Sequence, residues 1–296
     1  MDASPELSRT AARRGPAELG RFLEIQNLGL NVPFALAFVL VAADGLPRAL
    51  PFALIVLAFV AARNAGHAFN RWVDRDLDAA NPRTADRALP SGRLTPGFAL
   101  GVTAASSAVV LLCAGLLNPL ALALAPVALA LVLGYSYTKR YSTLTTAFLG
   151  LVEAITPAAA FVALDARLPL AALLAVGAVF AWGTAFETVH SLGDLASDRI
   201  LGLRSIPARL GERRSVVLVA ALHGAALSLL AAFGLAEGLR WPYDVALAAI
   251  AVGVAATDLR LAGSPAQARI PFRRHFLFAA IFLLGVAVAL FVPLPP

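Results

Sequence analysis

The sequence is poor in charged residues and in cysteine. Only 14% of its 296 residues are charged, whereas 59% are hydrophobic, and the mean hydropathy is +0.79. A water-soluble domain of this length needs more polar side chains to cover its surface, so we infer a membrane protein. The single cysteine, Cys113, has no second cysteine with which to pair. A secreted scaffold held together by intrachain disulfides is therefore excluded.

Lysine is almost absent as well. Lys139 is the only one, and 23 arginines make up the rest of the basic residues, giving a formal net charge of +6. The basic residues lie in short stretches between apolar runs and do not form one basic segment. This pattern is typical of membrane topology, and we therefore expect no nucleic-acid partner.

Long apolar runs recur along the chain. A bilayer core of about 30 Å requires roughly 20 apolar residues in a helix. Nine runs have about this length, and they cover residues 24–43, 48–70, 97–117, 119–137, 145–164, 168–190, 214–234, 242–261 and 274–292. The runs lack the alternating polarity of barrel strands. We predict an all-α, integral membrane bundle of about nine transmembrane helices.

The loops between these runs differ strongly in basic residues. Residues 1–23 and alternate loops together carry twenty of them, whereas the opposite loops carry only Arg48, Arg167 and Arg240. By the positive-inside rule, the side with more arginine faces the cytoplasm. We therefore expect a multi-pass protein of the cell inner (plasma) membrane with residues 1–23 as a cytoplasmic tail. Those residues contain no apolar stretch before a cleavage site, so we expect no removed signal peptide.

Two of the predicted cytoplasmic connections, residues 70–96 and 191–213, carry aspartates at intervals of four residues. The spaced residues are Asn70, Asp74 and Asp78 in the first connection, and Asp194 and Asp198 in the second. Residues four apart share one face of a helix. Each set should therefore form a stripe of oxygen atoms, which continues toward the membrane through His67 and Arg63 in one case and Glu187 in the other.

These stripes predict a metal site. Facing carboxylates repel one another unless a cation lies between them, and oxygen ligands suit Mg²⁺, which also binds phosphate oxygens and water. The predicted metal ligands are Asn70, Asp74, Asp78, Asp194 and Asp198.

Further donors follow at the end of the fourth run, which reads Tyr135-Ser-Tyr-Thr-Lys139-Arg140. Aspartates, metal ions and basic side chains together predict a diphosphate ligand, and the surrounding apolar helices predict a lipid tail, as in a prenyl diphosphate. We predict that Lys139 acts in catalysis with the four aspartates. Substrate binding is predicted for Arg63, Asn70, Tyr135 and Arg140.

The two motifs resemble those of the UbiA family of membrane prenyltransferases. Residues 70–93 resemble the family's first aspartate-rich motif and the loop after it, residues 194–211 resemble its second motif, and residues 135–140 resemble the basic turn between them. The resemblance spans about residues 20–292. It is greatest to family members that prenylate 4-hydroxybenzoate and to their relatives in the futalosine route to menaquinone.

The resemblance implies a transmembrane domain over residues 24–292 with a central cavity that opens sideways to membrane lipid. It also implies Mg²⁺-dependent transfer of a polyprenyl chain from its diphosphate to an aromatic acceptor in quinone biosynthesis. The resemblance leaves other acceptors of the family as alternatives, namely dihydroxynaphthoate, haem, chlorophyllide and archaeal lipid. No residue stands out as the base that removes the ring proton.

A secondary transporter is the main alternative outside the family. Charged residues inside membrane spans can form a proton relay, but a transporter is expected to have charges and broken helices near the bilayer midplane. In this sequence most charges lie at one predicted face of the membrane.

Overall fold

The computed structural model describes residues 16–25, 28–82, 84–200, 202, 204–264 and 272–293. These residues form helices and no strand, so the predicted all-α class is confirmed. The helices are α2 (Pro16–Phe22), α3 (Leu28–Ala42), α4 (Ala49–Ala80), α5 (Pro96–Leu117), α6 (Pro119–Tyr141), α7 (Thr145–Asp165), α8 (Leu170–Gly193), α9 (Leu195–Ile200), α10 (Ile206–Leu210), α11 (Glu212–Ala236), α12 (Trp241–Gly263) and α13 (Phe272–Phe291).

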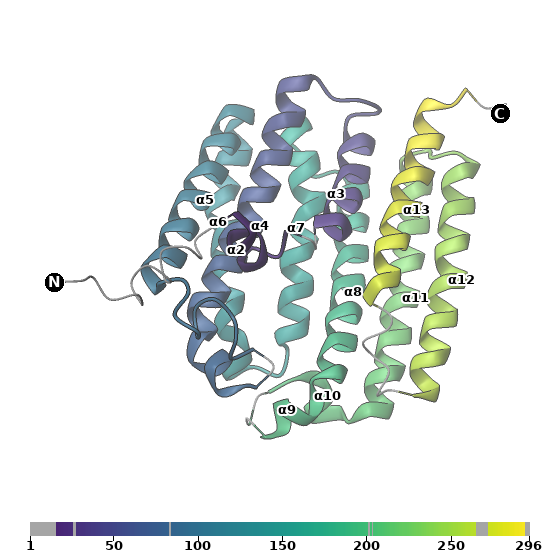
Figure 1. Ribbon diagram of the computed structural model, residues 1–296. Coiled ribbons are helices and arrows are strands. Elements are labelled where there is room, and N and C mark those ends of the chain that lie inside the picture. The colour runs from purple at the N-terminus through teal and green to yellow at the C-terminus, as the bar shows by residue number, and fades with distance from the viewer. Residues whose placement is uncertain are drawn as a thin grey trace.

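The long helices run side by side as a bundle (Figure 1). Among the described residues, eight helices are long and apolar enough to cross a membrane: α4 to α8 and α11 to α13. The first predicted span corresponds to α3, which has only 15 residues. The described bundle therefore has eight candidate spans and one shorter apolar helix, as expected for a multi-pass membrane protein.

Short helices and connections gather at one end of this bundle. Helices α9 and α10 lie there, as does the connection between α4 and α5, at the bottom of Figure 1. Both aspartate motifs belong to this end, which we call the aspartate end.

The opposite end is held by Asn118, which lies between α5 and α6. Its side-chain oxygen accepts a hydrogen bond from the backbone N–H of Ala121 at 2.8 Å and so caps α6. Its amide nitrogen donates to the carbonyl oxygens of Val162 and Ala163, at 2.8 and 3.1 Å, near the end of α7. One residue therefore fixes the ends of three helices.

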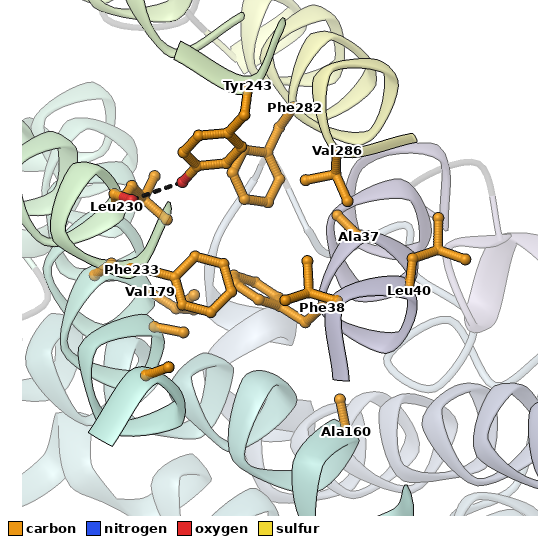
Figure 2. Close-up of a cluster of buried hydrophobic side chains, with 14 of the residues drawn as sticks. Ala37, Phe38, Leu40, Ala160, Val179, Leu230, Phe233, Tyr243, Phe282 and Val286 are labelled. Carbon is orange, nitrogen blue, oxygen red and sulfur yellow. Dashed lines mark hydrogen bonds between the residues drawn. The ribbon is translucent and has the colours of Figure 1, made fainter. Parts of the chain in front are cut away.

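Aromatic rings make the core between the first and last apolar helices (Figure 2). Phe38 of α3, Phe233 of α11 and Phe282 of α13 are buried together, and the ring centroids of Phe38 and Phe282 lie 5.6 Å apart. The hydroxyl of the buried Tyr243 on α12 donates to the carbonyl oxygen of Leu230 at 2.7 Å. The phenol is thus buried with its polar atom satisfied.

Helices α7 and α8 approach each other closely at two glycines. A Cβ atom at Gly150 would lie 2.7 Å from the carbonyl oxygen of Phe180 and 2.8 Å from the backbone nitrogen of Thr184. A Cβ atom at Gly183 would meet the carboxylate of Glu153. Small residues are what allow two helix backbones to come this close in a membrane protein.

The described part of the predicted tail packs on the bundle. Phe22 and Leu23 are buried with Ala68 and Leu89, residues of α4 and of the connection after it. Glu18 accepts a hydrogen bond from Nε of Arg93 at 3.0 Å, and this bond lowers the pKa of Glu18 although burial opposes it. Helix α2 is therefore attached to the aspartate end by both apolar contacts and charge.

Candidate active site

A cavity of about 770 Å³ lies inside the bundle, and residues from α3 to α9 and from α11 to α13 line it. Most of the lining is apolar. The charged lining residues are Glu24, Arg63, Arg71, Asp74, Asp78, Arg87, Glu153, Glu187, Asp194, Asp198 and Arg204. A pocket with a large apolar part and a cluster of charges suits a ligand with an apolar tail and a charged head.

Helix α4 carries the first motif. We expected its span to end at residue 70, but the helix continues to Ala80 and includes the whole motif. The structure places Arg63, His67, Asn70, Asp74 and Asp78 along the cavity wall. The amide nitrogen of Asn70 donates to Oδ2 of Asp74 at 3.0 Å, and the side chain of Asp74 is buried. Asn70 thus orients the neighbouring carboxylate.

The connection after α4 folds back onto Asp78. Arg87 donates to Oδ1 of Asp78 at 2.7 Å, and Nη1 of Arg71 lies 3.9 Å from Oδ2. The hydroxyl of Thr84 donates to the backbone carbonyl of Asp78 at 3.0 Å. These contacts hold two guanidinium groups next to the last carboxylate of the motif, where they can also meet the charge of a phosphate.

Glu24 is a lining residue that sequence reasoning missed. It lies after α2 with a positive φ of 50°, and its carboxylate pairs with Arg71. Arg63 donates to the carbonyl oxygens of Leu23 and Glu24 at 2.7 and 2.9 Å. Burial raises the pKa of Glu24, but the nearby positive charges, Arg71 foremost, outweigh it and the net shift is downward. No periodicity in the sequence indicates this return of the chain to α4.

The second motif differs from our expectation of one helix that carries both aspartates. Helix α8 ends at Gly193, and Asp194 follows as its C-cap with φ −103° and ψ 4°, while Asp198 lies in α9. The backbone N–H of Asp198 still donates to the carbonyl of Asp194 at 2.9 Å, so one helical turn connects them. Both aspartates and Glu187 line the same cavity as the first motif.

The end of α6 completes the aspartate end. Tyr135 lines the cavity, whereas the side chains of Lys139 and Arg140 lie outside the described part of the structure. Two further lining residues were missed, Ser136 and Thr146. Their hydroxyl oxygens are buried, and neither has a hydrogen-bond partner in the described part of the chain. Buried polar atoms of this kind are typical of a place that receives a ligand or water.

The donor atoms fit a magnesium ion that a ligand completes. In the described ranges, no three His, Cys, Asp or Glu side chains are grouped closely enough to hold a metal. Magnesium, however, typically takes only one or two carboxylates and fills its other positions with phosphate oxygens and water. Oδ2 of Asp78 is buried and accepts no hydrogen bond from the residues described, so it suits a cation.

Residues 31–281 match the UbiA prenyltransferase family. The chain belongs to this family. The predicted class of enzyme, a prenyltransferase, is therefore confirmed. A 4-hydroxybenzoate octaprenyltransferase from Cupriavidus necator is 32% identical over 250 residues, which are 84% of this chain and 87% of the relative. The same kind of enzyme from Methylobacillus flagellatus is 33% identical over 211 residues, 71% of each chain.

Solved structures agree with the fold. A UbiA homologue from Aeropyrum pernix superposes with a TM-score of 0.78 at 30% identity, and the match covers 90% of this chain and 98% of that one. A homologue from Archaeoglobus fulgidus, solved with GPP and Mg²⁺, has a TM-score of 0.71, with coverage of 91% and 99%. Its identity of 18% makes the second likeness one of fold alone.

Proposed function

We propose that this UbiA-family enzyme transfers a polyprenyl chain from its diphosphate to a 4-hydroxybenzoate-like aromatic acceptor in ubiquinone or menaquinone biosynthesis. The observation that carries the proposal is that both aspartate motifs line one cavity whose remaining wall is mostly apolar. The names of the relatives from C. necator and M. flagellatus support the choice of acceptor. Exposed residues of the spans, such as Leu112, Leu235 and Val252, would contact membrane lipid.

Two kinds of residue would hold the donor substrate. Asn70 and the four aspartates would ligate Mg²⁺, because they line one cavity and offer the oxygen ligands that this ion prefers. Such ions, when bound, neutralise diphosphate oxygens and weaken the bond between the allylic carbon and oxygen. Arg63, Arg140 and Lys139 would add positive charge around the leaving group, and Tyr135 would donate a hydrogen bond to it.

The apolar wall would serve the second half of the reaction. Loss of diphosphate leaves an allylic carbocation, which water would destroy. Lining residues such as Val132, Phe59 and Leu149 leave few places for ordered water. The electron-rich ring of the acceptor then becomes the nucleophile available to the cation.

Product analysis tests this function. Membranes that contain the protein should convert geranyl diphosphate and 4-hydroxybenzoate into diphosphate and a prenylated acid, identified by mass, and EDTA should stop the conversion. Dihydroxynaphthoate offered in parallel tests the main alternative acceptor. Diphosphate release with no prenylation of either acid would reject an aromatic acceptor of this class.

Lys139 should act on the donor substrate. We expect Lys139→Met to slow single-turnover diphosphate release about ten- to hundredfold, because one charged hydrogen bond contributes about 1.5–3 kcal/mol. Lys139→Arg should retain part of the rate, since it keeps the charge but not its compact shape. An unchanged rate in Lys139→Met would show that Lys139 serves only as a topological anchor.

The aspartate end should face the cytoplasm. The side chains of Asp86 and Arg167 are 98% and 73% exposed, and they belong to connections at opposite ends of the bundle. The native Cys113 is buried and gives little background. A membrane-impermeant thiol reagent should label Asp86→Cys only from the cytoplasm and Arg167→Cys only from the other side. The reverse result would invert the proposed orientation.

A further inference from the structure

One wall of the cavity carries a histidine surrounded by aromatic rings. His275, in the first turn of α13, is 3% exposed, and its ring centroid lies 4.8 Å from that of Phe186, 5.6 Å from Trp182 and 5.7 Å from Phe278. All four side chains line the cavity. Within the described residues, Nδ1 of His275 is buried and has no hydrogen-bond partner. Packing alone does not require an imidazole at this place.

A second histidine lies behind the first. The ring centroid of His223, on α11, is 6.3 Å from that of His275, and Nδ1 of His223 lies 3.0 Å from both carboxylate oxygens of Asp258 on α12. Nε2 of His223 is buried and has no partner among the described residues. At this ring separation, a small rotation or one bridging water would connect the unpartnered nitrogens of the two histidines. The order Asp258, His223, His275 then leads from α12 to the cavity.

These positions lie on the side of the cavity where the acceptor would react in the proposed function. Phe186, which contacts His275, lies on α8 eight residues before its C-cap Asp194, or roughly 12 Å along a helix. A diphosphate bound at the motifs would place its allylic carbon, and then the acceptor ring, deeper in the cavity in this direction. The faces of Trp182 and Phe186 also suit a neighbouring carbocation, since aromatic rings attract cations.

We propose that His275 is the catalytic base that takes the ring proton of the aromatic acceptor, and that His223 and Asp258 are positioning residues that orient His275 and accept the proton from its other nitrogen. The inference rests on the proposed function. His275 would then be the base that removes the ring proton, a role for which the sequence alone indicates no residue.

The proton transfer balances without any further reactant. After the ring attacks the allylic cation, the ring carbon that forms the new bond still carries its hydrogen. This C–H bond breaks, its electron pair restores the aromatic ring, and the proton moves to the cavity-facing nitrogen of His275. The proton on the other nitrogen passes to His223, whose positive charge the carboxylate of Asp258 stabilises. The proton then leaves when the products do.

An isotope experiment on the full-length protein tests this role. Single turnovers use geranyl diphosphate and 4-hydroxybenzoate that carries hydrogen or deuterium on the ring carbons next to the hydroxyl. In the wild type, ionisation of the donor should limit the rate, and deuterium should have little effect. His275→Gln should slow product formation ~100-fold or more, the usual contribution of a general base, and should make it sensitive to deuterium. The KM for geranyl diphosphate should stay unchanged.

Two other variants make the result specific. Asp258→Asn keeps the size and hydrogen bonding of the pair, and it should show a smaller loss with the same isotope effect, even if His275→Gln fails to fold. Tyr243→Phe is the matched control, because it removes a different buried hydrogen bond between α11 and α12 and should leave the isotope effect at its wild-type value.

The outcomes separate the two proposals. Normal product formation in His275→Gln, or a slower rate in both variants without an isotope effect, would overturn the role of His275 and leave the proposed function intact. A wild-type protein that releases no diphosphate and forms no product would overturn the proposed function, and the base with it.

Discussion

Replacement of Asp74 or Asp198 by asparagine is expected to lower Mg²⁺-dependent prenyl transfer by about 10³-fold or more, while the protein still inserts into the membrane. The estimate follows because a metal ion contributes several kcal/mol to charge stabilisation and each 1.36 kcal/mol is a factor of ten in rate. Asp74 belongs to the first motif and Asp198 to the second, and both line the same cavity. Initial rates of diphosphate release over a range of Mg²⁺ concentrations measure the effect.

Asp76 offers a matched control on the same helix. Its side chain is 80% exposed, and it pairs only loosely with Arg75, at 3.5 Å. Asp76→Asn makes the same chemical change one turn or less from Asp74, and we expect activity close to that of the wild type. If Asp198→Asn kept normal Mg²⁺-dependent turnover while Asp74→Asn lost it, the model of metal sites shared between both motifs would be wrong.

The second large effect is expected on stability, at the contact between α7 and α8. Gly150→Ala places a methyl group against the backbone of Phe180 and Thr184, and neither backbone atom can move aside as a flexible side chain would. Overpacking typically costs about 1–3 kcal/mol, and we expect the upper part of this range. The purified protein in detergent should unfold at a clearly lower temperature and lose activity together with its fold.

Gly134→Ala separates this effect from a general sensitivity of glycine positions. Gly134 lies within α6, and apart from its chain neighbours and the backbone of its own helix, no described atom comes within 4 Å of a Cβ atom built there. Alanine should therefore leave the unfolding temperature unchanged or raise it slightly, because alanine is the better helix former. Equal destabilisation by both substitutions would show that the close contact of α7 and α8 is not the cause.

The spans could be predicted because the thickness of the bilayer fixes the length of an apolar helix. Helix ends in the polar connections were harder to predict. Helix α4 continues through the first motif, whereas α8 ends at Gly193, just before the second motif, although both motifs have the same four-residue spacing. Spacing shows which residues would share a helix face, but tertiary contacts decide whether the helix continues.

The sequence predicted the part of the candidate site that carries the aspartate motifs. It did not predict the residues that reach the cavity from distant segments of the chain. The aspartates stood out because they repeat in two polar connections. Glu24 and His275 reach the cavity only through packing between segments that are far apart in the sequence. One signal was available: Asp258 lies within the predicted span 242–261, and an acidic residue inside a membrane span marks a function or a partner.

The attachment of α2 and Glu24 has a consequence for shortened forms of the chain. A protein trimmed to the start of its apolar segments at residue 25 would keep every helix that crosses the bilayer. It would lose the carbonyl groups that hold Arg63 and the carboxylate that pairs with Arg71. Such a protein would insert normally, but Arg63 and Arg71 in its cavity would lack these hydrogen-bond and ion-pair partners. Correct insertion into the membrane therefore does not show that the cavity is intact. The amino-terminal segment is part of the structure that positions the arginines of the cavity.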